Sequence, residues 1–381
     1  MQPNTTESLR RYDLDWLRVI TIITVFFFHT GRFFDEGGWH VKDALRLENF
    51  QDMTDLLVIW IMPMMFVISG AAIYYGFRNG KVGKFLRDKV LRLLVPVVVG
   101  MFTHSILQMY FDATTNGRFV GSFWAFLPHY FEGVFPFGGN FSVTSVHLWY
   151  LEVLFIFCLL FLPIFIWLKG SGQNTWQAIG NFLARPGSLY LLAIPTILLV
   201  TLLDPSNIGM KDTGGWNVFA YMTFFLPAFI FVPHSLVQER LQRQRWLSLA
   251  LAVFFSLAYW SLEDATFGSI GYLAESTLIT LASWSWMFAL LGIAGRYLTF
   301  TTPFLKYANE AVLPFYILHQ PVLLCVGIFI VKTTLPVLGK YFVILGISFV
   351  AIMLIYEFLV RRFNFMRFLF GMKIRSKEEI A

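Results

Sequence analysis

Long apolar segments separated by shorter polar ones recur along the whole chain. A helix needs about 20 apolar residues to cross the hydrocarbon core of a bilayer. Segments of suitable length lie at about 17–34, 54–77, 90–112, 145–168, 187–203, 215–233, 245–262, 271–295, 312–331 and 341–360. The pattern therefore predicts an all-α, polytopic integral membrane protein with about ten transmembrane helices.

The basic residues between these segments are unevenly distributed. If the N-terminus is cytoplasmic, 22 of the 29 Lys and Arg residues fall on the cytoplasmic side of the ten predicted spans. Cytoplasmic segments of membrane proteins carry such an excess of positive charge. We therefore expect one transmembrane domain over residues 1–381, with residues 1–16 and 361–381 as a cytoplasmic N-terminus and a cytoplasmic C-terminal tail.

Composition agrees with this class. Hydrophobic residues make up 57% of the chain and charged residues 14%, which lies outside the range of soluble globular proteins. The net charge is +6. In a membrane protein, excess Lys and Arg usually orient the chain in the bilayer and contact anionic lipid headgroups. We therefore expect membrane lipid as a partner, and no nucleic acid. Cys158 and Cys325 fall inside apolar segments, which predicts small buried side chains and no metal cluster.

The first apolar segment carries polar side chains along one face. Arg18 and His29 are eleven residues apart, which on an α-helix is about 16 Å and within about 20° of the same direction. Asp15, one turn before Arg18, is placed to pair with it. Two interpretations are open. In the first, Arg18 anchors the helix at the membrane surface and His29 is a buried, hydrogen-bonded side chain. In the second, the face that the two residues share lines a substrate channel.

Two other spans add charged candidates. Glu152 lies in the fourth segment at about the depth of His29, so it is a candidate partner that fixes the imidazole tautomer. Lys89 and Arg92 belong to the densest basic run and share a helix face at spacing i, i+3. They either orient the protein in the membrane or bind phosphate at its cytoplasmic side.

Smaller and neutral groups complete the set. Ser69 and Gly70 in the second segment either let helices approach closely or leave room for a thin substrate. His319 precedes Pro321 in the ninth segment, where it either bonds backbone freed by the proline or belongs to a site. The expected outer loops 35–53 and 112–144 are rich in aromatic residues, which suit an interfacial belt and equally suit stacking on sugar rings.

Together, these residues resemble the membrane-bound acyltransferase family 3. The matching features, in chain order, are Arg18 and His29 in the first span, FVISG at 66–70, a basic pair at Lys89 and Arg92, HLWYLE at 147–152, and His319 before Gln-Pro. The family usually has Arg-x-x-Arg at the basic pair, and Lys89 departs from this. The resemblance covers most of the chain.

The resemblance implies an enzyme of the bacterial cell (inner) membrane. Such an enzyme moves an acyl group from cytosolic acyl-CoA, either acetyl-CoA or succinyl-CoA, to a hydroxyl of a carbohydrate outside the cytoplasm. WHV at 39–41 and the absence of an appended domain are similar to the branch that succinylates periplasmic glucans. That branch would bring glycan-synthesis proteins as possible partners.

Residue roles follow from the resemblance. It implies His29 as general base, with Glu152, matched to it by depth, as the candidate partner; a covalent acyl-histidine is also open. The remaining candidates are Arg18, Lys89, Arg92 and Ser69 for the acyl-CoA donor, and His147, Trp149 and His319 for the acceptor. The alternative is a transporter or exporter in which the same polar residues line a path and no bond is made; we find no repeat symmetry of the kind expected there.

Overall fold

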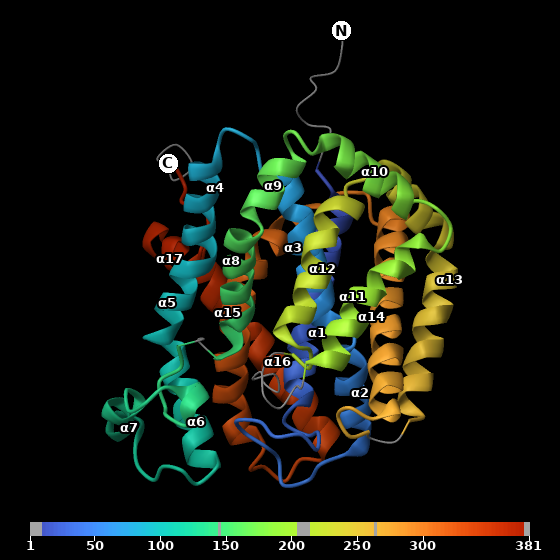
Figure 1. The fold of residues 1–381 in the computed structure, drawn as a ribbon. Coiled ribbons are helices and arrows are strands. Elements are labelled where there is room, and N and C mark those ends of the chain that lie inside the picture. Colours follow the sequence, from blue (N-terminus) through green and yellow to red (C-terminus); the bar gives the residue numbers. More distant parts are fainter. Residues whose placement is uncertain (1–9, 144–145, 204–213, 263–264, 377–381) are drawn as a thin grey trace. The chain divides into compact units, whose positions relative to one another are not determined.

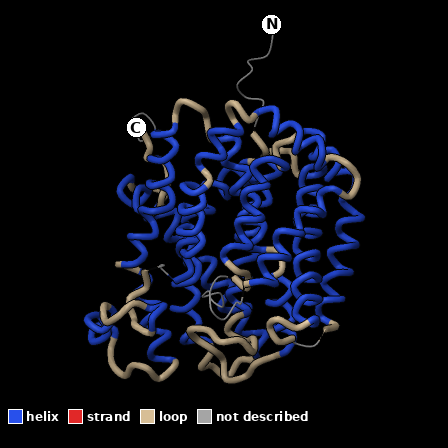
Figure 2. Tube along the Cα trace, viewed as in Figure 1, coloured by secondary structure: helices blue, strands red, loops and turns tan. Residues whose placement is uncertain are grey.

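The computed structural model describes residues 10–143, 146–203, 214–262 and 265–376. These residues form helices and loops, with one isolated bridge between Val134 and Phe141 and no β-strand among them (Figure 2). The all-α prediction is therefore confirmed for the described part of the chain. Lys211 and Lys377, which the charge count uses, lie outside the described residues.

Backbone contacts divide the chain into two compact units, each assembled from three separate segments. Unit 1 consists of Met1–Thr21, Ile59–Phe77 and Ile164–Glu310. Unit 2 consists of Ile22–Val58, Arg78–Pro163 and Ala311–Ala381. Because the segments alternate along the chain, neither unit is a continuous stretch of sequence.

Unit 1 is built around packed apolar helices. The helices wholly within it are α3 (Ile61–Gly76), α10 (Gln173–Leu183), η4 (Ser188–Leu192), α11 (Ala193–Leu202), α12 (Val218–Phe231), α13 (Ser235–Trp260) and α14 (Ile270–Tyr297). The two longest, α13 and α14, lie side by side (Figure 1). A Cβ on Gly70 of α3 would lie 2.1 Å from the carbonyl oxygen of Phe225 in α12. The prediction that small residues in this span allow close helix packing is confirmed at Gly70.

Unit 2 contains more and shorter elements. They are α2 (Glu48–Val58), α4 (Val82–Lys89), η1 (Val90–Leu94), α5 (Val95–Met101), α6 (His104–Thr115), α7 (Phe123–Tyr130), η2 (Phe135–Phe137), η3 (Val146–Leu148), α8 (Trp149–Leu160), α16 (Val337–Ile355), η5 (Tyr356–Val360) and α17 (Asn364–Leu369). Phe126 and Tyr130 of α7 are fully buried against Met109 of α6. Part of the aromatic loop 112–144 is thus a small packed cluster, while Trp124 stays 76% exposed.

Three helices have residues in both units: α1 (Tyr12–Gly31), α9 (Leu162–Leu168) and α15 (Pro303–Ile330). The helix predicted at 17–34 is confirmed as α1, which is uninterrupted over 20 residues. The division falls between Thr21 and Ile22, so α1 contributes Arg18 to unit 1 and His29 to unit 2.

The helices are long and apolar enough for a protein that crosses a membrane several times. Among the described residues, five helices qualify singly: Tyr12–Gly31, Glu48–Gly76, Ile270–Tyr297, Pro303–Ile330 and Val337–Val360. Four further pairs qualify only when each pair, bent by 45° to 117°, is counted as one span, which gives up to nine. The sequence pattern gives ten because it treats α12 and α13, joined at 112°, as separate spans.

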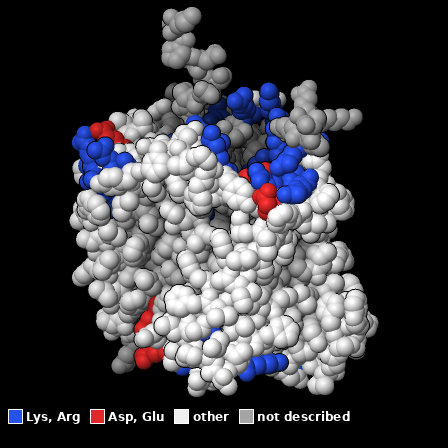
Figure 3. Space-filling model, turned by 180° about the vertical axis from the view of Figure 1, so that it is seen from behind, with Lys and Arg blue, Asp and Glu red and all other residues white. Residues whose placement is uncertain are grey.

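The surface composition fits contact with lipid. Phe254 of α13 and Phe342 of α16 are 61% and 59% exposed. Figure 3 shows that most of the face in view carries none of Lys, Arg, Asp or Glu, and that basic side chains gather in patches. Apolar exposure on this scale is unusual for a soluble protein and expected for helices that face hydrocarbon.

Candidate functional site

Four of the seven histidines lie together in unit 2, each on a different element: His29 on α1, His319 on α15, His147 on η3 and His104 on α6. The ring centroids of His29 and His319 are 4.9 Å apart, and those of His319 and His147 are 5.1 Å apart. His104 follows at 5.6 Å from His147. The structure thus brings together three histidines that the sequence analysis singled out and a fourth that it did not.

The hydrogen bonds fix which nitrogen of His29 carries a proton. Nδ1 of His319 faces the carbonyl oxygen of Tyr316, which can only accept, so this nitrogen carries the proton of a neutral ring. Nε2 of His319 is then the acceptor for Nδ1–H of His29 at 3.1 Å. Nδ1 of His29 also faces the carbonyl oxygen of Val25 at 3.0 Å. A neutral His29 therefore keeps its lone pair on Nε2, which hydrogen-bonds to no described residue.

His147 is held from two sides. Its Nε2 lies 3.0 Å from the carbonyl oxygen of Ile317 on α15, and its Nδ1 lies 3.2 Å from Oε1 of Gln108 on α6. The hydroxyl of Tyr316 donates to the backbone carbonyl of His147. Val146, just before it, has φ of 53°, a strained conformation for a β-branched residue. The backbone of η3 is thus positioned by its contacts with α15 against its own local preference.

An aromatic residue from the first loop covers His29. The ring of Trp39 stacks on the imidazole at 6.0 Å with an interplanar angle of 28°. Phe33 packs edge-on against Trp39 at 4.7 Å. His40 then pairs with Asp112 of α6 at 3.0 Å, which fixes the loop on the other side. The WHV sequence therefore belongs to the surroundings of His29.

Arg18 lies in a polar cluster within unit 1. Its guanidinium donates to Asp15 at 3.4 Å and to the amide oxygen of Asn309 on α15 at 3.1 Å. The amide nitrogen of Asn309 in turn donates to Asp15 at 3.2 Å, and Arg10 also pairs with Asp15. The predicted pairing of Asp15 with Arg18 is confirmed. The guanidinium is part-buried, with its side chain 29% exposed.

Lys89 and Arg92 do not share an ordinary α-helical face. The chain is α-helical up to Lys89 and π-helical from Val90 to Leu94. Pro96 has no N–H, so the carbonyl of Arg92 lacks its usual α-helical donor, which explains the wider turn. The i, i+3 spacing therefore does not by itself place the two side chains on one face, and their joint binding of phosphate stays a prediction.

The other candidates form no hydrogen bond with His29, whose partners among the described residues are Val25 and His319. Glu152 is in the first turn of α8, and it forms no hydrogen bond or ion pair with another described residue. The hydrogen-bond partner of His29 is therefore His319, and the expected pairing with Glu152 is wrong. Trp149 begins α8, and Ser69 lies on α3 in unit 1. No described group of three His, Cys, Asp or Glu side chains has the arrangement of a metal site.

Sequence reasoning missed His104, Gln108 and Asn309. His104 falls in the third apolar segment, so the rule that favours His319, an imidazole inside a span, would have selected it. Gln108 lies one turn further along α6. Asn309 precedes the ninth apolar segment among ordinary polar residues, and no local pattern marks it.

These features define a class: a membrane protein, helical over the described residues, with a cluster of four histidines in which Nε2 of His29 has no hydrogen-bond partner among those residues. The sequence model described as "Acyltransferase domain" matches residues 11–357, and the chain belongs to this acyltransferase 3 family, as the resemblance indicated. Proteins named "Glucans biosynthesis protein C" from Salmonella paratyphi A and Salmonella agona are 24% identical to it over 387 residues, covering 97% of this chain and of each relative. No solved structure matches it significantly.

Proposed function

We propose that the chain is a multi-pass O-acyltransferase of the bacterial inner membrane with His29 as general base. It transfers an acyl group, succinyl or acetyl, from cytosolic acyl-CoA to a hydroxyl of a glucan or related polysaccharide outside the cytoplasm. The observation that carries the proposal is the fixed tautomer of His29. Its Nδ1–H is shared between His319 and Val25, and its Nε2 lone pair can accept a proton.

The reaction needs one proton acceptor. The acceptor hydroxyl oxygen forms a C–O bond with the thioester carbonyl carbon while its proton passes to Nε2 of His29. The C–S bond then breaks, and the departing CoA sulfur takes the proton back from the imidazole. General-base assistance of this kind contributes about 10²- to 10⁴-fold in rate. His319 supports the developing imidazolium because its Nε2 accepts from the Nδ1–H of His29.

Donor binding uses the basic candidates. Arg18 in unit 1, and Lys89 and Arg92 in unit 2, are each proposed as candidates that bind phosphate groups of CoA, since guanidinium and ammonium groups form strong charge-assisted hydrogen bonds with phosphate. The pantetheine arm is proposed to follow the face of α1 that carries Arg18 and His29. The continuity of α1 from Tyr12 to Gly31 supports this assignment.

Acceptor binding is proposed near His147, Trp149 and His319. The printed name of the relatives, glucans biosynthesis, favours a glucan as the carbohydrate. Glu152 has a smaller part in this proposal than the sequence suggested, because His319 orients His29. We assign Glu152 to contact with substrate from α8, and we expect glycan-synthesis proteins to supply the acceptor.

The test measures acyl transfer by purified protein in detergent or nanodiscs. Succinyl-CoA and acetyl-CoA are supplied in turn with a glucose oligosaccharide, and the ester product is followed by mass spectrometry. Wild-type protein should form the ester with one donor, and His29→Ala should lower kcat by at least about 10²-fold. The matched control is His129→Ala, because His129 is an exposed histidine on α7 that pairs with Glu132.

Two outcomes would contradict the proposal. Ester formation by His29→Ala at the wild-type rate would remove the general-base role. Binding of the oligosaccharide with no ester from either donor would favour a transporter or exporter. A stable acyl adduct on His29 would replace direct transfer with a covalent route.

A further inference from the structure

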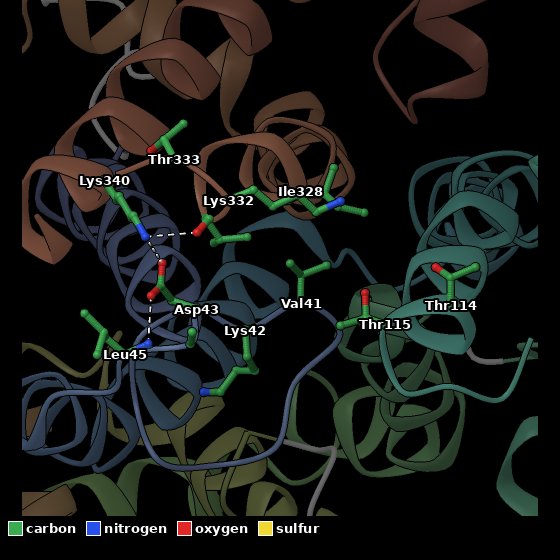
Figure 4. Close-up of a pocket in the computed structure, with 12 residues that line it drawn as sticks. Val41, Lys42, Asp43, Leu45, Thr114, Thr115, Ile328, Lys332, Thr333 and Lys340 are labelled. Carbon is green, nitrogen blue, oxygen red and sulfur yellow. Dashed lines mark hydrogen bonds and ion pairs between the residues drawn. The ribbon is translucent and has the colours of Figure 1, made fainter. Parts of the chain in front are cut away.

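A cavity of about 720 Å³ lies in unit 2 beside the loop that covers His29. Figure 4 shows that its walls come from three places. They are the loop Val41–Leu45, the end of α6 at Thr114 and Thr115, and the segment Ile328–Lys340, which runs from the end of α15 into α16. Cavities of about 300–1,000 Å³ are typical of small-ligand sites, so this one has room for a few sugar units.

Two lysines of the wall are already neutralised. Lys340 pairs with Asp43 at 2.6 Å, and Figure 4 shows the two groups pointing toward one another. Lys42 pairs with buried Asp35. Burial lowers the pKa of Lys42, and the Asp35 carboxylate opposes that shift. These ion pairs hold the walls and leave Lys332 as the charged lining residue without an ion pair among the described residues.

The remaining polar groups offer both donors and acceptors. The ammonium of Lys332 forms no hydrogen bond or ion pair with another described residue, so its donors are available. Thr115 is exposed, and its hydroxyl forms no hydrogen bond with another described residue. The hydroxyls of Thr114 and Thr333 donate to backbone carbonyls of Tyr110 and Ile330, which leaves their oxygens as acceptors. Such an alternation of donors and acceptors matches the hydroxyls of a sugar better than it matches an apolar ligand.

The cavity adjoins the aromatic cover of His29. Trp39 stacks on His29, and Val41, two residues later, lines the cavity. Phe33, which packs on Trp39, also lies against Gly327, the neighbour of lining residue Ile328. One short loop thus forms the cover of the imidazole and a wall of the cavity.

We propose that this cavity binds the carbohydrate acceptor, with Lys332, Thr115 and Thr333 as hydrogen-bonding groups. The inference rests on the proposed function, because it assigns the acceptor to a specific place beside His29. The sugar chain occupies the cavity, and the hydroxyl that is acylated extends past Trp39 toward Nε2 of His29.

The first experiment measures binding without any acyl donor. A β-linked glucose hexasaccharide is titrated into the full-length purified protein by isothermal calorimetry. Lys332→Met and Thr115→Val remove polar groups from exposed positions, so both variants should fold. Lys332→Met should raise Kd by about tenfold, as expected for loss of a charged hydrogen bond. The control is Lys306→Met, an exposed lysine at the opposite end of α15.

The second experiment separates this inference from the proposed function. In the transfer assay, the cavity variants should raise KM for the hexasaccharide by about tenfold with little change in KM for acyl-CoA. Wild-type ester formation together with unchanged Kd and KM in both variants would overturn the cavity site and leave the acyltransferase proposal intact. Binding that weakens in the variants without any transfer by wild type would support the cavity and overturn the reaction. No binding of the hexasaccharide to wild type would overturn the cavity site.

Discussion

An imidazole can act as a base only through the nitrogen that lacks a proton. In His29 that nitrogen is Nε2 because His319 and Val25 both face Nδ1. His319 is itself fixed by the carbonyl of Tyr316, and it is 1% exposed. The carbonyl of Tyr316 therefore determines the tautomer of His29 indirectly, because it fixes the tautomer of His319.

This chain of contacts predicts different effects for two substitutions of His319. Gln can place its amide oxygen near the position of Nε2 and accept from His29, whereas Leu cannot. We expect His319→Leu to lower kcat by about 10- to 100-fold, within the range of general-base effects. His319→Gln should recover part of that loss, and KM for acyl-CoA should change little in either variant. Steady-state kinetics would measure kcat and KM for acyl-CoA in both variants.

A purely structural role for His319 would give another result. Both variants would then lose activity in proportion to the amount of unfolded protein, which thermal unfolding would detect. Equal kcat for His319→Leu and His319→Gln in well-folded protein would contradict the positioning role.

The difference between local and long-range contacts explains which of these residues the sequence could identify. Asp15 and Arg18 are three residues apart on a helix, so their pairing follows from helical geometry. His29 and His319 are 290 residues apart, and no periodicity relates them. The wrong pairing of His29 with Glu152 came from matching estimated depths, which leaves the direction around each helix undetermined.

At the scale of elements, helix packing depends on a few small residues. The apolar character of α3 predicts a buried helix but does not show which neighbour it contacts. At Gly70, an added Cβ would meet the Phe225 carbonyl oxygen at 2.1 Å and the Ala228 side chain at 3.1 Å. Because a backbone oxygen cannot move as a flexible side chain does, α3 and α12 would have to separate.

Gly70→Ala should therefore destabilise the protein, although Ala favours helix by about 1 kcal/mol over Gly. Overpacking of a tight contact costs about 1–3 kcal/mol, so we expect a net loss and a lower Tm. Gly83→Ala in α4 is the matched control, since nothing lies within 4 Å of its added Cβ. It should be neutral or slightly stabilising. Thermal unfolding in one detergent would compare the variants, and equal Tm values would contradict the close contact.

The pattern of apolar residues does not predict the breaks and bends within a helical segment. Residues 90–112 were predicted as one span, yet the chain there changes from π-helix to α5 and then bends by 45° before α6. Pro96 explains the first change, because it removes a backbone donor. A hydropathy window averages over such breaks, so it locates apolar segments well and their bends poorly.

For the whole molecule, the number of spans decides where the two termini lie. An even number places them on the same side of the membrane and an odd number on opposite sides. The described helices give up to nine spans with four bent pairs. The pattern of basic residues favours ten, because Arg240, Arg243 and Arg245, in the first half of α13, then lie near the cytoplasmic ends of two separate spans, α12 and α13.

We expect the ten-span arrangement, with both termini cytoplasmic. Fusions of a reporter that fluoresces only in the cytoplasm should be bright at either terminus, and phosphatase fusions there should be inactive. Glu239, 56% exposed on α13, gives an internal check. In a variant without Cys158 and Cys325, Glu239→Cys should react with a membrane-impermeant thiol reagent only after the cells are opened. Labelling in intact spheroplasts, or termini on opposite sides, would contradict ten spans and favour α12 and α13 as one broken crossing.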